Sequence, residues 1–234
     1  MTARARTLVL PDVHGNYELL VCLLEAASPT KDDRIIQLGD LMNCVFDSEE
    51  GDLLCLETAK NVGAEILVGN HEHPLLGGPR FSGYYEHPAV REAYSETTVL
   101  PSATVGPVLI THAGLTTQRT EARGTAEETN HLLRSLWAEE PRASVFSDIS
   151  PHRGGRQLRG GVLWADLHEP KERRFSQLFG HTPHDGPTLA LHEETEGQTW
   201  TCCIDVGGKY GREACGAWLY EDGRPPEFVR VRKR

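Results

Sequence analysis

The 234-residue sequence is poor in basic residues: 24 lysines and arginines stand against 34 aspartates and glutamates, so the formal net charge is -10 at pH 7. Proteins that hold nucleic acid or anionic membrane surfaces without sequence preference do so with clustered lysine and arginine. The short basic stretch RVRKR at 230–234 is too small to alter this balance. The composition therefore argues against general nucleic-acid binding and against membrane binding.

Long apolar runs and paired cysteine motifs are also missing. No stretch approaches the roughly 20 apolar residues of a transmembrane helix, and the opening MTARARTLVLPD lacks the cleavage pattern of a signal peptide. The six cysteines contain no CxxC pair, which argues against a zinc knuckle or a disulfide framework. We therefore expect a cytoplasmic protein with buried free thiols at Cys22, Cys55, Cys202, Cys203 and Cys215.

The first half of the sequence alternates between two hydrophobic periods. At 38% hydrophobic content, the length suits one domain spanning residues 1–234. Apolar runs of strand length alternate with segments of helical spacing, at 7–10, 16–27, 34–38, 52–63 and 64–68. This β-α-β-α-β pattern predicts a parallel sheet.

The second half predicts helices at 88–95 and 125–140, a pair of strands at 102–105 and 107–111, and a loop at 150–161. Four later segments have strand character: 174–179, 187–192, 199–206 and 214–231. We expect them to form a second, more antiparallel sheet. Two sheets with helices outside them make a four-layer α/β/β/α sandwich.

Polar side chains follow five of the apolar runs, at the point where each run ends. They are Asp12, His14, Asp40, Asn70, His71, His112 and His181. A single residue of this kind would most simply be a turn, cap or surface residue. Functional sites of open α/β sheets lie at the carboxyl ends of the strands, so the set as a whole predicts one site.

Carboxylate, amide and imidazole groups together suit borderline divalent metals, and we expect two ions, manganese first, with iron, zinc, nickel or cobalt as alternatives. The two aspartates, Asp12 and Asp40, would leave four positive charges only partly neutralised, which favours a phosphate ligand. Two ions about 3.5 to 4 Å apart can activate a water and clamp the oxygens of a displacement at phosphorus. The residue types therefore predict phosphoester hydrolysis.

Five ordered motifs carry a family resemblance: DVHGN at 12–16, GD at 39–40, GNHE at 69–72, THAGL at 111–115 and GHTP at 180–183. Further similarity lies in LWAD at 163–166 and IDVGGKYG at 204–211. The sequence resembles the calcineurin-like metallophosphoesterases, in particular the bacterial and phage phosphoprotein phosphatase branch, close to the symmetric diadenosine tetraphosphatases. The similarity covers nearly the whole chain.

The resemblance implies two sets of metal ligands joined by one bridging residue: Asp12, His14 and His181 on one ion, Asn70 and His112 on the other, and Asp40 on both. It also implies that a hydroxide held by the two metals attacks a phosphomonoester. His71 would then protonate the leaving oxygen, since an imidazole with a pKa near about 6.5 is a suitable general acid at neutral pH.

The second motif departs from the family pattern GDxxDRG, because this sequence has GDLMNCV at 39–45. Asn43 replaces the aspartate that would orient His71, and Cys44 replaces the arginine that would grip the phosphate. We expect the Asn43 amide oxygen to accept a hydrogen bond from His71 but to stabilise its protonated form less than a carboxylate would. Two interpretations of Cys44 remain, a simple spacer or a reactive thiol.

Loop arginines are candidates for the missing phosphate clamp, and we select Arg153, Arg156 and Arg80. The substrate would be a phosphoprotein, a small phosphoester or a nucleotide. One alternative is a symmetric diadenosine polyphosphatase or another nucleotide hydrolase. A second is a non-catalytic, metal-dependent binding protein that lost turnover through Asn43 and Cys44.

Overall fold

The first strands of the chain form the parallel part of a six-stranded sheet. The computed structural model describes residues 6–43, 48–81, 84–85, 87–194, 197–210 and 213–232. The sheet has the order β11-β10-β1-β2-β3-β4. The parallel strands are β1 (Arg6–Leu10), β2 (Arg34–Gln37), β3 (Glu65–Leu67) and β4 (Val99–Leu100). The predicted parallel sheet is confirmed for β1, β2 and β3.

A five-stranded mixed sheet, in the order β5-β6-β7-β9-β8, packs against the first. Its strands are β5 (Ser102–Val105), β6 (Val108–Thr111), β7 (Ser176–Phe179), β8 (Thr188–Glu194) and β9 (Gly197–Cys203). β6, β7 and β9 run parallel to one another, and β5 and β8 pair antiparallel at the two edges. The carboxyl ends of β6 and β7 therefore lie side by side.

The assignment of the last strands to the second sheet was wrong. β10 (Glu213–Tyr220) pairs antiparallel with β1 in the first sheet, and β11 (Glu227–Arg232) continues that sheet as its edge. Six consecutive β10 residues are buried, so this strand needs cover on both faces and a neighbour on each side. A local strand pattern shows which faces are apolar but not which strand is the partner.

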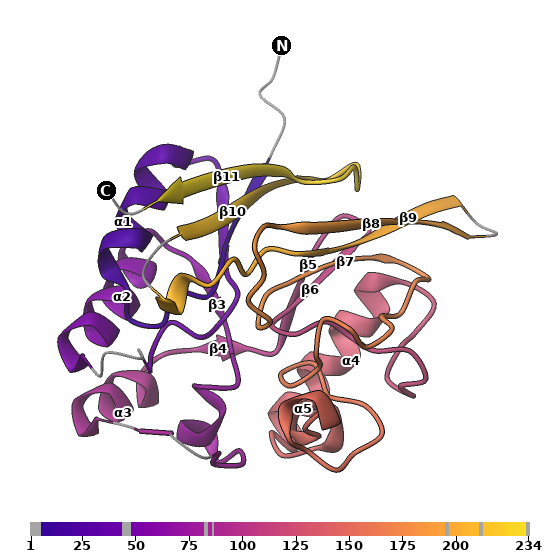
Figure 1. Cartoon of the computed structure of the whole chain (residues 1–234), viewed down its shortest axis with the longest axis horizontal. Coiled ribbons are helices and arrows are strands. Elements are labelled where there is room, and N and C mark those ends of the chain that lie inside the picture. The colour runs from indigo at the N-terminus through magenta and orange to yellow at the C-terminus, as the bar shows by residue number, and fades with distance from the viewer. Residues whose placement is uncertain are drawn as a thin grey trace.

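Helices cover the outer faces of both sheets (Figure 1). The helices are α1 (Tyr17–Ala27), α2 (Glu49–Asn61), α3 (Pro88–Ser95), α4 (Ala126–Glu139) and α5 (Ser144–Ser147). α1 packs on β10 and β11, and α4 packs on β5 and β6. Three short 3-10 turns lie in loops: η1 (His73–Leu76), η2 (Pro151–Arg153) and η3 (Gly208–Tyr210). The architecture is thus the expected two-sheet α/β sandwich.

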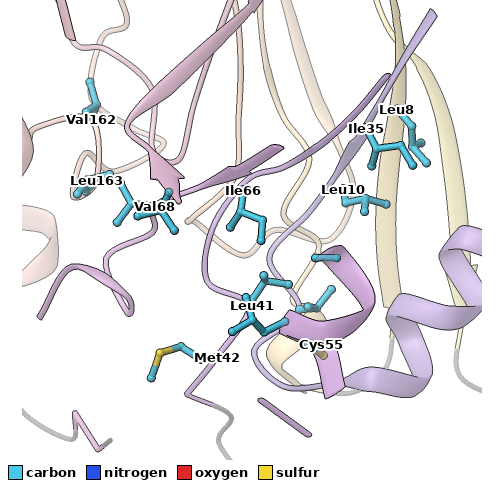
Figure 2. Packing of buried hydrophobic residues seen from close by; sticks show 14 of the residues in the cluster. Leu8, Leu10, Ile35, Leu41, Met42, Cys55, Ile66, Val68, Val162 and Leu163 are labelled. Atoms are coloured by element: carbon cyan, nitrogen blue, oxygen red, sulfur yellow. The ribbon is translucent and has the colours of Figure 1, made fainter. Parts of the chain in front are cut away.

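Consecutive residues of β1 point into two different hydrophobic clusters, one on each face of the sheet. Leu8 and Leu10 point to the helix-covered side, whereas Val9 points into the layer between the sheets. Figure 2 shows Leu8, Leu10 and Ile35 on adjacent strands, with Cys55 of α2 in the same cluster. Burial on both faces explains why the strands read as continuous apolar runs rather than as alternating ones.

The cysteines are free thiols at the five described positions, as expected. Cys22 is exposed on α1, however, which corrects the expectation that it is buried, because it lies on the solvent side of an amphipathic helix. Cys44 lies outside the described residues. Among the described helices, none combines the length and the apolar composition that crossing a bilayer requires.

Removing a side chain from between the sheets should reduce stability strongly. Leu178 of β7 is 0% exposed in the inter-sheet cluster, whereas Leu189 of β8 is 41% exposed. We expect Leu178→Ala to lower the free energy of unfolding by about 2–5 kcal/mol, and Leu189→Ala by about 1 kcal/mol or less. Urea unfolding followed by tryptophan fluorescence measures both, and equal losses would contradict this account of the core.

Candidate metal centre

Backbone hydrogen bonds link the loop after β1 to the loop after β2. The amide groups of Val13 and His14 donate to the carbonyl oxygen of Asp40 at 3.2 and 2.8 Å. Asp12 and His14 are buried at this edge, with 1% and 4% exposure. Because β1 and β2 are parallel neighbours, their carboxyl ends deliver these side chains to the same place.

Glu72 joins the loops after β2 and β3. Its carboxylate is fully buried and accepts hydrogen bonds from the backbone amides of Asp40 at 2.7 Å, Leu41 at 2.9 Å and Gly69 at 2.9 Å. The hydroxyl of Tyr94 donates to the same carboxylate at 3.3 Å. Glu72 therefore sets the spacing between Asp40 and the GNHE loop, without facing the cavity itself.

Three electron-pair donors converge on Nε2 of His112. Its Nδ1–H donates to the carbonyl oxygen of Leu38 at 3.0 Å, which leaves the Nε2 lone pair facing the site. Nε2 lies 3.1 Å from Asn70 Oδ1, 3.0 Å from His181 Nδ1 and 3.5 Å from Asp40 Oδ2. Lone pairs crowded in this way repel one another unless a proton or a cation lies among them.

A second group of donors lies on the other side of Asp40. His14 Nε2 and His71 Nε2 are 3.5 and 3.9 Å from Asp40 Oδ2, and their rings meet edge to face at 4.7 Å. Asp40 is common to both of the donor groups that could hold an ion. Its position between them is the geometry that a ligand shared by two ions requires.

His181 lies with His112 rather than with His14, which differs from the division of ligands expected from the resemblance. Its Nδ1 belongs to the donor group that contains His112 and Asp40. The reason is strand order, because His112 follows β6, His181 follows β7, and these two strands are parallel neighbours. The ring of His181 consequently reaches Asp40 from the side of the second sheet.

Asp12 carries an unsatisfied oxygen. Its Oδ2 accepts the backbone N–H of His181 at 2.9 Å, but its Oδ1 is buried and has no hydrogen-bond partner within the described part of the chain. Gly180 leaves room for this oxygen, since a Cβ there would lie 2.1 Å from Oδ1. A buried carboxylate oxygen without a hydrogen bond is unfavourable unless a cation compensates it.

The electrostatics of the two aspartates differ. Burial raises the pKa of Asp12 well above its ordinary value, and the Asp205 and Asp40 carboxylates raise it further. Burial alone would also raise the pKa of Asp40, yet that pKa is well below the ordinary value because imidazoles face it, namely those of His112, His71 and His14. Nitrogen and oxygen donors around buried carboxylates fit a borderline divalent ion.

Several residues of the site have a strained, left-handed backbone conformation. Six non-glycine residues of the described chain have positive φ, and four of them are His14 at 45°, Asp40 at 51°, Asn43 at 67° and His181 at 72°. Left-handed backbone at such residues costs about 1–3 kcal/mol each and persists where surrounding contacts enforce it. No feature of the sequence predicted these conformations.

His71 is held by the residue that departs from the family pattern. Its Nδ1–H donates to Asn43 Oδ1 at 3.0 Å, which confirms the predicted contact. The Asn43 amide in turn donates through Nδ2 to the carbonyl oxygen of Tyr85. His71 Nε2 is thereby turned toward Asp40 and the open side of the site.

A cavity of about 280 Å³ opens over the two donor groups. Its lining consists of His14, Asp40, Asn70, His71, Phe81, Arg153, Trp164 and His181. Arg153 is therefore brought to the centre, while Arg156 and Arg80 are exposed and lie outside the described lining. Phe81 was missed by sequence reasoning, since the glycine- and proline-rich segment around it carries no periodic signal.

Arg153 is fixed from three sides. Its guanidinium lies 3.0 Å from the Asp166 carboxylate and donates to the Thr182 hydroxyl at 2.6 Å and to the carbonyl oxygen of His181 at 3.3 Å. A guanidinium held in this way presents its remaining donors in a defined direction. This arrangement leaves the two N–H groups of Nη1 to donate to a phosphate.

Comparison with known proteins agrees with this geometry, since residues 5–202 match the calcineurin-like phosphoesterase family. The chain belongs to that family. It is accordingly a metal-dependent hydrolase of phosphoric esters, and the family uses two metal ions. The donor set around Asp40 fits such a pair, because its buried carboxylates and imidazoles need cationic partners.

Solved structures resemble this phosphoesterase over nearly its full length. A candidate diadenosine tetraphosphatase has a TM-score of 0.59 and 18% identity, with 99% of this chain and 95% of that chain covered. A Saccharomyces cerevisiae protein serine/threonine phosphatase with similarity to human PP5 has a TM-score of 0.55 and 12% identity, with 99% and 80% covered. At these identities the likeness shows the fold alone.

A curated protein from Acinetobacter sp., named long-chain-aldehyde dehydrogenase, is 27% identical over 126 residues. The match covers 53% of this phosphoesterase but only 22% of that protein. The chain thus spans about a fifth of the relative it matches.

Weakening the Glu72 link should loosen metal binding. Glu72→Gln replaces one acceptor oxygen by an amide that cannot accept backbone N–H groups, so we expect manganese affinity to fall by about 10–100-fold. Titration calorimetry measures the affinity. Glu128→Gln, at the exposed cap of α4, is the matched control and should bind manganese like the unaltered protein. An unchanged affinity for Glu72→Gln would refute the positioning role.

Proposed function

We propose that the protein hydrolyses phosphomonoesters in the cavity over Asp40. The observation that carries the proposal is the Asp40 carboxylate, shared between two donor groups beside a histidine whose Nε2 faces the same cavity. Two bound divalent ions would supply an activated water and neutralise phosphate charge. Manganese is the ion we propose, and iron, zinc, nickel and cobalt suit the same donors.

The ligands divide on either side of Asp40. We assign Asp12 and His14 to one ion, and the second ion to Asn70, His112 and His181. The assignment is supported by the unsatisfied Oδ1 of Asp12 and by the convergence on His112 Nε2.

His71 would deliver the proton to the leaving oxygen. Its Nδ1–H is engaged by Asn43, so Nε2 is the nitrogen that carries the transferred proton. The side chain is 18% exposed, which lets a substrate reach it. The amide partner fixes the ring without adding negative charge, so the imidazolium is less stabilised than it would be beside a carboxylate.

Arg153 would bind the phosphate in place of the arginine that the sequence lacks at Cys44. Its contacts with Asp166 and Thr182 hold it at the wall of the cavity. The substrates that this site suits are phosphoproteins and small phosphoesters, and a symmetric dinucleoside polyphosphate is the second candidate. A cytoplasmic location belongs to the same proposal.

Activity should depend on metal and on His71. After removal of metal by a chelator, hydrolysis of p-nitrophenyl phosphate should cease, and added manganese should restore it. His71→Ala should lower kcat by about 10²–10⁴-fold with metal bound, because the leaving oxygen is no longer protonated. His131→Ala, at an exposed position of α4, is the control. Full activity of His71→Ala would exclude the proton-donor role.

Two arginines of one loop should behave differently. Arg153→Ala should lower kcat/KM for the same substrate by about 10–100-fold, since it removes a charged hydrogen-bonding partner of the phosphate. Arg156→Ala serves as the matched control, because Arg156 is exposed and outside the cavity lining. Steady-state kinetics measures both variants. If Arg156→Ala shows the larger loss, the phosphate is held elsewhere.

A further inference from the structure

Two aromatic rings make up the part of the cavity that the proposed chemistry does not use. Of the lining residues, five belong to the donor groups or to His71, and one is Arg153. The remaining two are Phe81 and Trp164, whose ring centroids are 5.4 Å apart in an edge-to-face arrangement. We call this pair the aromatic wall.

One end of the aromatic wall lies beside the proposed proton donor, and the other end lies beside a proposed metal ligand. The Phe81 ring meets the His71 ring edge to face at 4.8 Å, and Trp164 lies 6.2 Å from the His181 ring. If His71 protonates the leaving oxygen, the atoms bonded to that oxygen lie next to Phe81. The leaving group therefore meets the Phe81 end of the aromatic wall.

The chemistry of the wall selects an uncharged, planar group. Beyond the metal donors, His71 and Arg153, no charged side chain is among the described lining residues. The Trp164 indole N–H is buried and has no hydrogen-bond partner in the described structure, so one donor is left at this wall. Aromatic rings pack on one another with a preference of about 0.5–1.5 kcal/mol beyond area burial.

The cavity is small and open to solvent, so only a small leaving group would lie wholly inside it. Its volume of about 280 Å³ also has to hold the phosphate and the ions. Cavities for drug-sized ligands run from about 300 to 1,000 Å³. A phosphate with one ring directly on its ester oxygen fits this space, whereas a dinucleoside polyphosphate would extend far outside it.

We propose that the Phe81–Trp164 wall makes this enzyme selective for aryl phosphates, in which an aromatic ring is bonded directly to the ester oxygen. The inference rests on the proposed function and names its substrate class. In the reaction, water forms the new bond to phosphorus, the bond from phosphorus to the aryl oxygen breaks, and the proton from His71 goes to that oxygen. The products are a phenol and inorganic phosphate.

The first test measures binding and needs no turnover. Benzylphosphonate and propylphosphonate, in which a methylene replaces the ester oxygen of phenyl phosphate and ethyl phosphate, are titrated into manganese-loaded protein by calorimetry. The benzyl compound should bind about three- to tenfold more tightly. Phe81→Leu should abolish this preference, and Phe228→Leu, on exposed β11, should retain it. Equal affinities in the unaltered protein would overturn the proposal, whatever the catalytic results.

The second test compares kcat/KM for phenyl phosphate and ethyl phosphate in the same proteins. Phe81→Leu should reduce the aryl-to-alkyl ratio by about three- to tenfold. An equal loss on both substrates would mean that Phe81 only positions His71, and it would overturn the proposal. Binding preference without any turnover would instead refute the proposed function, so the two failures are distinguishable.

A third experiment distinguishes a protein-bound aryl phosphate from a small-molecule aryl phosphate. A phosphotyrosine peptide, a phosphoserine peptide, phenyl phosphate and diadenosine tetraphosphate are compared at equal concentration. Preference for the phosphotyrosine peptide indicates a protein source, and equal use of phenyl phosphate indicates a small aryl ester. Preference for phosphoserine or for the dinucleotide would overturn the proposal.

Discussion

The burial of the Asp40 carboxylate is the constraint on which the rest of the site depends. A desolvated carboxylate is unfavourable unless other groups hold and compensate it. Its backbone is fixed by Glu72, its Oδ1 accepts the N–H of His71 at 3.0 Å, and imidazoles approach its Oδ2 from two sides. Strained backbone at Asp40 and its neighbours follows from the same requirement, because relaxed φ angles would turn these groups away.

The sequence predicted that polar residues at the ends of strands lie together, but it did not predict which of these strands are neighbours. Asp12 and Asp40 could be recognised because an apolar run stops just before each of them. The grouping of His181 with His112 could not, since it follows from the pairing of β6 with β7. Strand periodicity encodes which face is buried, and it carries no information on the neighbouring strand.

The same limit explains the two other differences. β10 has the pattern of a strand but no local mark of its partner β1, from which more than 200 residues separate it. Phe81 lies in a segment without periodic structure, where a contact with His71 depends on the path of the loop. Local chemistry was therefore predictable, whereas contacts made by loops and distant strands required coordinates.

Asn43 shows why a departure from the family pattern need not be a loss. A carboxylate at this position could orient His71 but has no hydrogen to donate, whereas the amide accepts from His71 and donates to the Tyr85 carbonyl. One residue thereby links His71 to Tyr85. The amide provides less charge for the imidazolium, and an aryl oxygen, as a better leaving group than an alkyl oxygen, needs less help from it.

Arg153 is likewise the proposed replacement for a family residue that this sequence lacks, the arginine that binds the phosphate. The family pattern GDxxDRG places an arginine four residues after the aspartate of GD, whereas here the guanidinium at the cavity comes from Arg153 of η2. Its hold on Thr182 and on the His181 carbonyl couples it to the strand end that carries a metal donor. Arg153 is thereby linked to the loop after β7, which carries His181, whereas Asp12, Asp40 and His71 follow strands of the first sheet. The proposed phosphate ligand thus comes from a loop, where sequences vary most readily, and the proposed metal ligands come from strand ends.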